Sequence, residues 1–375
     1  MTATSTTVDL KNRLERARQT AGAAGIDALL ITPSQDLRYL VGYDAKALER
    51  LTCLALPVSG GGPVLVVPRL ERGAAEASGV EQLDVEIVTW EETEDPYALV
   101  AKLLPSGVRR IGLDNHMWAE KVLGFAAALP GVTQALANEV LTELRMRKSP
   151  FEVAALREAG AAIDRVHARV PDWLKVGRTE REVGADIAAA ILEEGHVQVD
   201  FTIVGSGPNS ASPHHEVSDR VIQRGEPVVV DIGGTTAAGY CSDSTRTYVM
   251  GSAPAAFVEY YEVLRQAQIA ACEHVRPGVS AESVDAAARS VIASAGFGDQ
   301  FIHRTGHGIG MESHEDPYIV AGNTLPLEPG MAFSVEPGIY FAGEHGARIE
   351  DILVVTESGG ERVNLRPREL TVLDG

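Results

Sequence analysis

The sequence predicts an α+β protein of two domains, and three observations lead to this class. The chain has 375 residues, which at roughly 150 residues per domain corresponds to two domains. Apolar runs of strand length alternate with helix-like segments as far as residue 145, whereas blocks of helices and strands follow one another after residue 149. With 45% apolar and 23% charged residues, the composition is that of a globular protein.

Residues 1–145 are predicted to form the first domain, a sheet covered by helices. Residues 10–24 have the pattern of an amphipathic helix, and residues 27–32 form a buried apolar run typical of a strand. Further strands are expected at 51–58, 64–68 and 85–89, and helices at 97–104 and 118–129. We find no chemical motif in this domain, because the glycines at 60–62 lack the frame of a phosphate-binding loop.

Residues 149–375 are predicted to form the second domain, after a basic, turn-forming segment. Ser149, Pro150 and Glu152 make a capping box with proline at the first helical position, which predicts a helix start. Thr179 and Glu182 make a second capping box, for a helix that runs to about residue 194. Two more helices are expected at 255–274 and 280–296, and strands at 200–205, 227–233, 242–250, 331–340 and 348–356.

Charge and cysteine content exclude several classes of partner and site. The net charge of −19, from 33 basic and 52 acidic residues, argues against a nucleic-acid partner, because nucleic-acid binding needs a positive surface. The three cysteines are too widely spaced for a disulfide framework or a thiolate zinc site. We therefore expect a protein of the reducing cytoplasm, and since neither a membrane-spanning run nor a signal-peptide core is found, we expect no membrane partner.

Four carboxylates stand at or after apolar strands of the second domain. Asp231 closes the run 228–230, and Asp243 follows twelve residues later, so that a hairpin would turn both carboxylates toward one pocket. Glu336 and Glu350 repeat this arrangement and are expected to form a second hairpin facing the first. An acid at the end of a buried run is costly unless it is paired or binds a metal.

His307 completes this set, because glycines on both sides leave its imidazole accessible. Four carboxylates and one neutral imidazole balance the charge of two divalent cations, which five such side chains can hold roughly 3.5–4 Å apart. An oxygen-rich donor set without thiolate suits manganese, with cobalt or zinc as alternatives. Each residue alone could also be a solvated edge acid or a core histidine, and the pattern by itself leaves both interpretations open.

These motifs resemble those of the M24 metallopeptidases of the pita-bread fold, which include aminopeptidase P, prolidase and methionine aminopeptidase. The resemblance is closest to the bacterial Xaa-Pro peptidases and covers essentially the whole chain. The stretch 32–40 resembles the creatinase-type N-terminal domain, and the five ligand motifs stand in the order of the family. The implied fold is a creatinase-type α/β N-terminal domain followed by a C-terminal pita-bread domain.

The resemblance also implies roles for single residues. The ligands of two divalent ions would be Asp231, Asp243, His307, Glu336 and Glu350, with Asp243 and Glu350 bridging the ions. Glu336 would also accept a proton, His214 and His314 would contact the substrate, and Arg348 would lie beside the metal site. His215 has no certain counterpart in the family, and His303 is expected to be structural.

The implied activity is hydrolysis of the N-terminal Xaa-Pro bond of a dipeptide or short peptide by a metal-bridging hydroxide, in a homodimer. Two departures from the family stand out. The spacing from Asp231 to Asp243 is one residue longer than usual, and Tyr318 stands where some prolidases carry an arginine for the carboxylate of a dipeptide. The alternatives are a pita-bread hydrolase or lyase for a non-peptide small molecule, and a binding module, which the intact ligand set disfavours.

Overall fold

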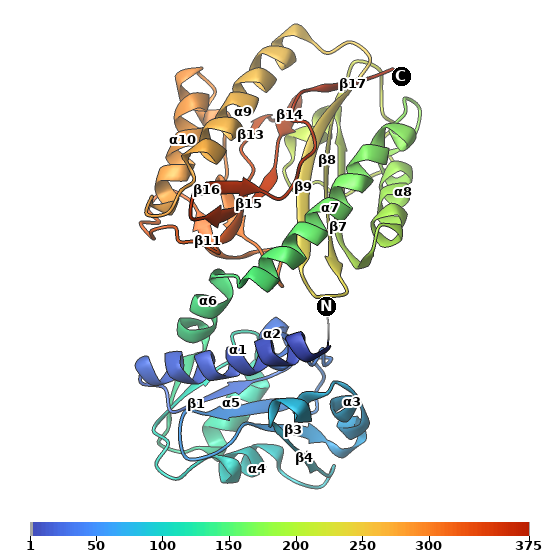
Figure 1. The fold of residues 1–375 in the computed structure, drawn as a ribbon. Coiled ribbons are helices and arrows are strands. Elements are labelled where there is room, and N and C mark those ends of the chain that lie inside the picture. The colour runs from blue at the N-terminus through green and yellow to red at the C-terminus, as the bar shows by residue number, and fades with distance from the viewer. Residues whose placement is uncertain (1–2, 375) are drawn as a thin grey trace. The chain divides into compact units, whose positions relative to one another are not determined.

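The computed structural model describes residues 3–374, with side chains from residue 7 onward. The chain divides into two compact units, Met1–Arg145 and Met146–Gly375 (Figure 1). Among residues 3–374, none of the helices combines the length and the apolar character needed to cross a bilayer.

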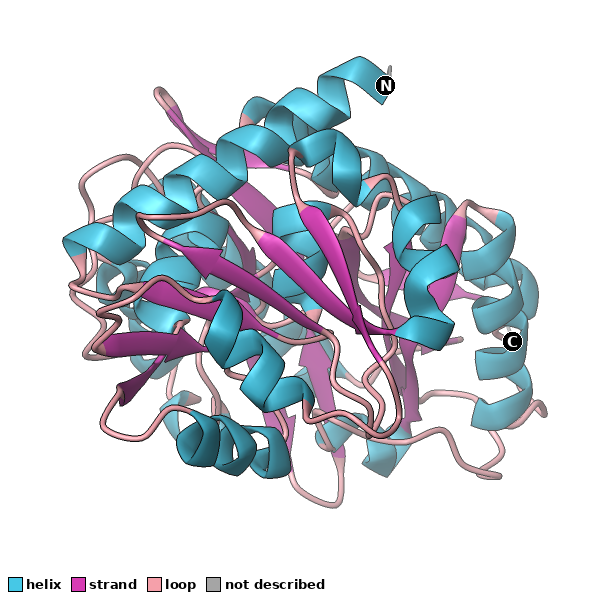
Figure 2. Cartoon of the chain, turned by 90° about the horizontal axis from the view of Figure 1, so that it is seen from below, coloured by secondary structure: helices cyan, strands magenta, loops and turns pink. Residues whose placement is uncertain are grey.

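The first unit is built on a six-stranded sheet with the order β4-β3-β2-β1-β5-β6. Strands β1, β2 and β3 pair antiparallel, and the outer pairs are parallel. All four residues of β1 are buried, because helices cover both faces of the sheet (Figure 2). The elements are α1 (Ala3–Ala23), β1 (Ala28–Ile31), α2 (Gln35–Val41), β2 (Cys53–Pro57), β3 (Val64–Pro68), α3 (Arg72–Ala77), β4 (Glu86–Trp90), α4 (Pro96–Leu103), β5 (Arg110–Leu113), α5 (Ala119–Ala128), β6 (Thr133–Leu136) and α6 (Asn138–Met146).

The second unit contains three sheets, ordered β17-β9-β8-β7, β11-β10-β12-β15-β16 and β13-β14. Its helices are α7 (Pro150–Trp173), α8 (Glu180–Glu193), α9 (Ala255–His274), α10 (Ala281–Ser294) and the short η3 (Gly207–Ala211). Its strands are β7 (His196–Ser206), β8 (Pro227–Thr236), β9 (Cys241–Met250), β10 (Gly306–Gly308), β11 (Glu315–Ile319), β12 (Ala332–Val335), β13 (Gly338–Phe341), β14 (His345–Arg348), β15 (Asp351–Thr356), β16 (Gly359–Arg362) and β17 (Thr371–Leu373).

Two helix pairs enclose these sheets from opposite sides (Figure 1). Helices α7 and α8 share an apolar core with β7, β8 and β9, while α9 and α10 share a second core with β12 and β15. Both predicted capping boxes are present. The Ser149 hydroxyl accepts a hydrogen bond from the Glu152 amide at the start of α7, and Thr179 does the same for Glu182 at α8. These caps fix where the helices begin.

The second hairpin expected from the sequence is present, but its first strand, expected at residues 331–340, is interrupted at Glu336 and Pro337. Pro337 follows Glu336 and has no N–H, so the ladder of β12 cannot continue through it. Val335 therefore pairs with Asp351 in one sheet, whereas Gly338 pairs with Arg348 in another. The register is the same on both sides of this break, so Glu336 and Glu350 lie opposite each other where the hairpin passes from one sheet to the other.

Candidate metal centre and active site

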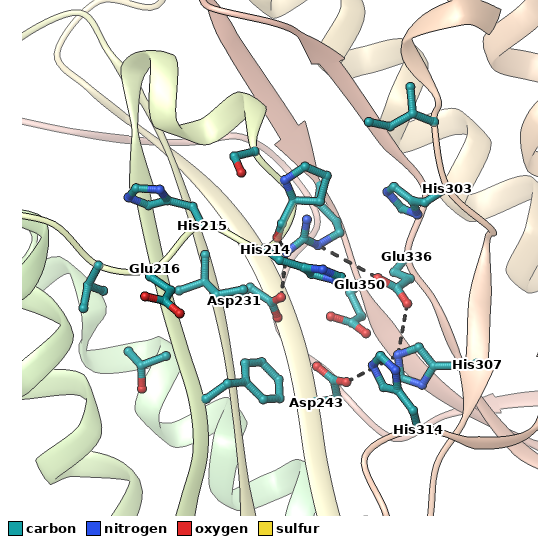
Figure 3. Close-up of a pocket in the computed structure, with 18 of the residues that line it drawn as sticks. His214, His215, Glu216, Asp231, Asp243, His303, His307, His314, Glu336 and Glu350 are labelled. Carbon is teal, nitrogen blue, oxygen red and sulfur yellow. Dashed lines mark hydrogen bonds and ion pairs between the residues drawn. The ribbon is translucent and has the colours of Figure 1, made fainter.

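A cavity of about 1130 Å³ lies in the second unit and contains every site residue that the sequence indicates (Figure 3). The residues that line it include Asp231, Asp243, His307, Glu336, Glu350, His214, His314 and Arg348. The five predicted metal ligands and the three predicted substrate or support residues are therefore in one place.

The register of the β8–β9 hairpin brings the first two acids together. Gly233 pairs with Asp243, and Asp231 lies two residues before Gly233 on the same face of the strand. Both carboxylates thus point to the same side of the sheet. The pairing of the two strands is regular as far as Thr235 and Cys241, and the Gly239 amide donates to the carbonyl oxygen of Thr236 in the turn between them.

His307 is held in a short strand that only glycine neighbours permit. A Cβ atom at Gly306 would lie 1.8 Å from the carbonyl oxygen of Ser334, and one at Gly308 would lie 2.2 Å from that of Asp316. The neighbouring strands approach this closely because neither glycine carries a side chain. The glycine frame seen in the sequence therefore serves strand packing around the imidazole.

The imidazole of His307 faces two of the acids. Its Nε2 atom lies 3.1 Å from Oε1 of Glu336 and 3.7 Å from Oδ2 of Asp243. Its Nδ1 atom donates to the carbonyl oxygen of Gly308, 3.1 Å away, so Nε2 is the nitrogen that faces the carboxylates. Without a cation, burial acts to lower the pKa of His307, but Glu336 outweighs it and raises that pKa, and Nε2 donates to this carboxylate, whereas a bound cation would take the place of this proton on Nε2.

Three overlapping groups of side chains have the spacing of metal ligands. In each group, one potential ligand atom from every residue lies within 4.8 Å of the others. The groups are Asp231–Asp243–Glu350, His307–Glu336–Glu350 and Asp243–His307–His314. Asp243, Glu350 and His307 each belong to two groups, and for the two carboxylates this is the arrangement expected of bridging ligands.

Two buried carboxylate oxygens also fit a cation. Oδ1 of Asp231 and Oε1 of Glu350 have no hydrogen-bond donor among the residues that the structure describes. A buried acceptor without a donor is costly, and a cation between such oxygens removes the cost. The residues present therefore fit divalent metal ions.

The pKa values of this cluster reflect burial and like charge. Burial, followed by the neighbouring Asp231, raises the pKa of Asp243, and burial together with Asp243 raises that of Glu350. Burial also acts to raise the pKa of Glu336, but the hydrogen bond and the charge of His307 outweigh it and lower that pKa to about 2. Without a cation, the acids cannot all be ionised at low cost.

Arg348 holds two of the acids in place, Asp231 directly and Glu350 through Thr245. Its Nη2 atom donates to Oδ2 of Asp231 at 2.6 Å, and its Nη1 atom donates to the hydroxyl of Tyr340 at 2.8 Å. Its Nε atom lies 3.2 Å from the hydroxyl oxygen of Thr245, which in turn donates to Glu350 at 2.8 Å. The predicted place of Arg348 beside the acids is thus the observed one.

His314 lies against the cluster on the side of the substrate cavity. Its ring centroid is 3.7 Å from that of His307, and burial together with the charge of His307 lowers its pKa to about 4. Arg304 Nη2 lies 3.4 Å from its Nδ1 atom, and the Arg304 guanidinium stacks 4.3 Å from the ring centroid of Tyr318. His314 is therefore neutral at pH 7 and accepts at Nδ1.

Sequence reasoning missed several residues of this site. His303, expected to be structural, lines the cavity and accepts from the hydroxyl of Tyr340, because its Nδ1 donates to the carbonyl of Arg304. The sequence could have indicated Thr245, because it stands two residues after Asp243 and therefore on the same face of the strand. No sequence pattern indicates Arg304, which the fold brings to the cavity, or Tyr340, which the fold brings into contact with Arg348 and His303.

Comparisons with known proteins agree with this geometry. The model of metallopeptidase family M24 matches residues 154–357, and that of the creatinase/prolidase N-terminal domain matches residues 13–147. The probable dipeptidase PepE of Mycobacterium tuberculosis is 54% identical over 361 residues, covering 96% of each chain. The Xaa-Pro dipeptidase of Lactobacillus helveticus is 36% identical over 371 residues, covering 96% of this chain and 98% of that protein.

The crystal structure of dipeptidase PepE from Mycobacterium ulcerans superposes with a TM-score of 0.94 at 54% identity, covering 98% of this chain and 99% of that one. The predicted fold, a creatinase-type N-terminal domain followed by a pita-bread catalytic domain, is confirmed. The chain is an enzyme, and it belongs to metallopeptidase family M24.

Proposed function

We propose that this metallopeptidase uses two divalent ions to hydrolyse the Xaa-Pro bond of dipeptides or short peptides. Manganese is the metal we expect first. The observation that carries the proposal is the overlap of the ligand groups. Glu350 is shared between the group with Asp231 and Asp243 and the group with His307 and Glu336, and Asp243 also belongs to a group with His307 and His314. Two neighbouring ions with two bridging carboxylates satisfy this arrangement.

The residues of the chain then have distinct tasks. When bound, the ions supply a water of lowered pKa and polarise the scissile carbonyl group. Glu336, whose pKa is about 2, is ionised at neutral pH and accepts the proton of the attacking water. His314 accepts from Arg304 at Nδ1, so its Nε2–H donates to the developing oxyanion, and His214 faces the same cavity.

The apolar part of the cavity wall suits the proline ring of a small peptide. Phe201, Ile203, Val217 and Ile302 give it an apolar surface beside the candidate ligands. We propose that Arg304 binds the carboxylate of a dipeptide and thereby replaces the arginine that is absent at Tyr318. Stacking on Tyr318 holds the guanidinium at the cavity. The names of the relatives, which include dipeptidases and an Xaa-Pro dipeptidase, support this choice.

The test offers an Xaa-Pro dipeptide, an Xaa-Pro-Yaa tripeptide and an Xaa-Ala dipeptide together, with manganese or with a chelator, and follows all three by mass spectrometry. We expect metal-dependent loss of the Xaa-Pro dipeptide. Loss of the tripeptide alone would instead indicate an aminopeptidase P-like enzyme. No hydrolysis by a protein with two bound ions would favour the non-peptide alternative, and activity that survives chelation would refute the metal mechanism.

The matched variants are Asp243→Asn and Asp172→Asn. Asp243→Asn removes one charge from a residue shared by two ligand groups, so we expect both metal binding and turnover to be lost. Asp172 is exposed on α7 and serves as the control that keeps both. Metal content is counted by elemental mass spectrometry on the same samples as the turnover assay.

A further inference from the structure

Glu180, the first residue of α8, is a fully buried acid that no motif of the sequence singles out. Its Oε1 atom accepts from the amide and the hydroxyl of Ser206, both at 2.8 Å, and from the side-chain amide of Asn209 at 3.0 Å. Its Oε2 atom lies 2.7 Å from Nε2 of His215 and 2.6 Å from the hydroxyl of Ser218. One carboxylate thus collects donors from the end of β7, from η3 and from the loop before β8.

These donors keep the carboxylate ionised. Burial alone would raise the pKa of Glu180, but hydrogen bonds from Ser218, Ser206 and His215 outweigh it and lower the pKa. The N-terminus of α8 favours a negative charge at this position as well. Glu180 is therefore a stable anchor that holds several segments together.

The loop anchored in this way forms a wall of the candidate active site. Residues 212–217 all line the cavity, and they include His214 and His215 (Figure 3). The residue before His214 is also fixed, because the Pro213 carbonyl oxygen accepts from Nη2 of Arg348 at 3.2 Å. His214 therefore stands between two tethered neighbours, one held by Arg348 and the other by Glu180.

We propose that Glu180 is a positioning residue that fixes His214 toward the substrate, acting through His215 and Ser218. The proposal rests on the proposed function, in which His214 contacts the substrate. His215 links the cavity wall to the anchor, which gives this histidine a role that the family resemblance did not supply. The loop is held because all of its donors meet the Glu180 carboxylate, which only accepts hydrogen bonds. The side-chain amide of a glutamine has one accepting oxygen and could not accept from all of them.

The first experiment replaces the anchor with Glu180→Gln in the metal-loaded protein. We expect kcat to fall about 10²-fold, because a displacement of the order of 1 Å at a catalytic group has this cost. Metal content should stay as in the wild type, since Glu180 touches none of the candidate ligands. Glu182→Gln is the matched control, because it changes an exposed acid of the same helical turn and should leave kcat unchanged.

His215→Phe is a second, milder variant that keeps the ring volume and all other contacts of Glu180. It should fold even where Glu180→Gln does not, and it should lower kcat in the same direction by a smaller factor. Hydrogen–deuterium exchange of residues 212–218 should rise in both variants. Unchanged exchange in both would overturn the proposal.

A double-mutant cycle with His214→Ala separates positioning from a general structural effect. If Glu180 acts through His214, then Glu180→Gln should cause no further loss of kcat in the His214→Ala background. An equal fold-loss in both backgrounds would refute the proposal. If the wild type hydrolyses no Xaa-Pro peptide, the proposed function fails, while the exchange experiment still decides whether Glu180 anchors the loop.

Discussion

The Nη2 atom of Arg348 lies 2.6 Å from Oδ2 of Asp231 and 3.2 Å from the carbonyl oxygen of Pro213. A single nitrogen thus joins a candidate metal ligand on β8 to the loop that carries His214. The same guanidinium also binds Tyr340, so its planar shape fixes three separate segments. A lysine ammonium at this position could not reproduce this geometry.

We therefore expect Arg348→Lys to weaken metal binding about 10–100-fold, because the orientation of Asp231 is lost. Titration calorimetry with manganese measures the affinity directly. Arg157→Lys, in an exposed pair with Glu361, is the control and should bind as the wild type does. An Arg348→Lys protein with wild-type affinity would show that the arginine does not orient the ligand.

His314→Ala tests whether this histidine serves the substrate or a metal. Its ring is close enough to Asp243 and His307 for either task. We expect metal content to remain and kcat to fall about 10²-fold, the usual cost of a lost oxyanion donor. Loss of one ion per chain would make His314 a ligand, and an unchanged kcat would return it to a structural role.

Arg304→Gln tests the recognition of the substrate carboxylate. A hydrogen bond to a charged group contributes roughly 1.5–3 kcal/mol, so KM for an Xaa-Pro dipeptide should rise about 10–100-fold. The Xaa-Pro amide, which lacks the carboxylate, should show the same KM with both proteins. If the substitution raises KM equally for the dipeptide and the amide, Arg304 acts on His314 rather than on the substrate carboxylate.

We expect Asp351 to make a contribution to the free energy of unfolding that is lost at acidic pH. Burial acts to raise its pKa, but Arg246, Arg362 and Arg368 surround it and lower the pKa to about 2. Because this is below the ordinary value of 3.8, the stabilisation is complete above about pH 4 and is lost as the pH falls to about 2. The shift corresponds to about 2 kcal/mol of unfolding free energy at neutral pH.

Urea unfolding of the metal-free protein between pH 7 and pH 2.5 measures this component. Asp351→Asn leaves three arginines without their acid and should lose about 3–5 kcal/mol at pH 7. The difference between the two proteins should narrow only below about pH 4. A difference that stays constant down to pH 2.5 would show that Asp351 is not the titrating group.

The sequence predicted those features that depend on local chemistry. The capping boxes at Ser149 and Thr179 place α7 and α8 correctly, and the acids after apolar runs indicate the cavity, because burial of an unpaired acid is rare. Their roles as ligands stay predictions, as do the homodimer and the cytoplasmic location.

Other features depend on residues that are distant in the chain. The short strands β5 and β6 carry too few residues for a periodic signal, and Glu180 resembles any first-turn acid of a helix. The break at Pro337 was visible in the sequence, but its consequence, the division of one hairpin between two sheets at Glu336, depends on the second segment that carries Glu350. Side-chain partners of this kind are set by the tertiary fold.

The candidate ligands lie on strands of different sheets or, for Glu336 and Glu350, at breaks between strands, so each ligand group forms only when these segments come together. Assembly of such distant segments is a late event in folding, because chain closure must precede it. A cation that binds only the finished cluster shifts the folding equilibrium toward the native protein. Metal bound to the cluster would therefore also slow proteolysis of the chain, because it would lower the population of the unfolded protein.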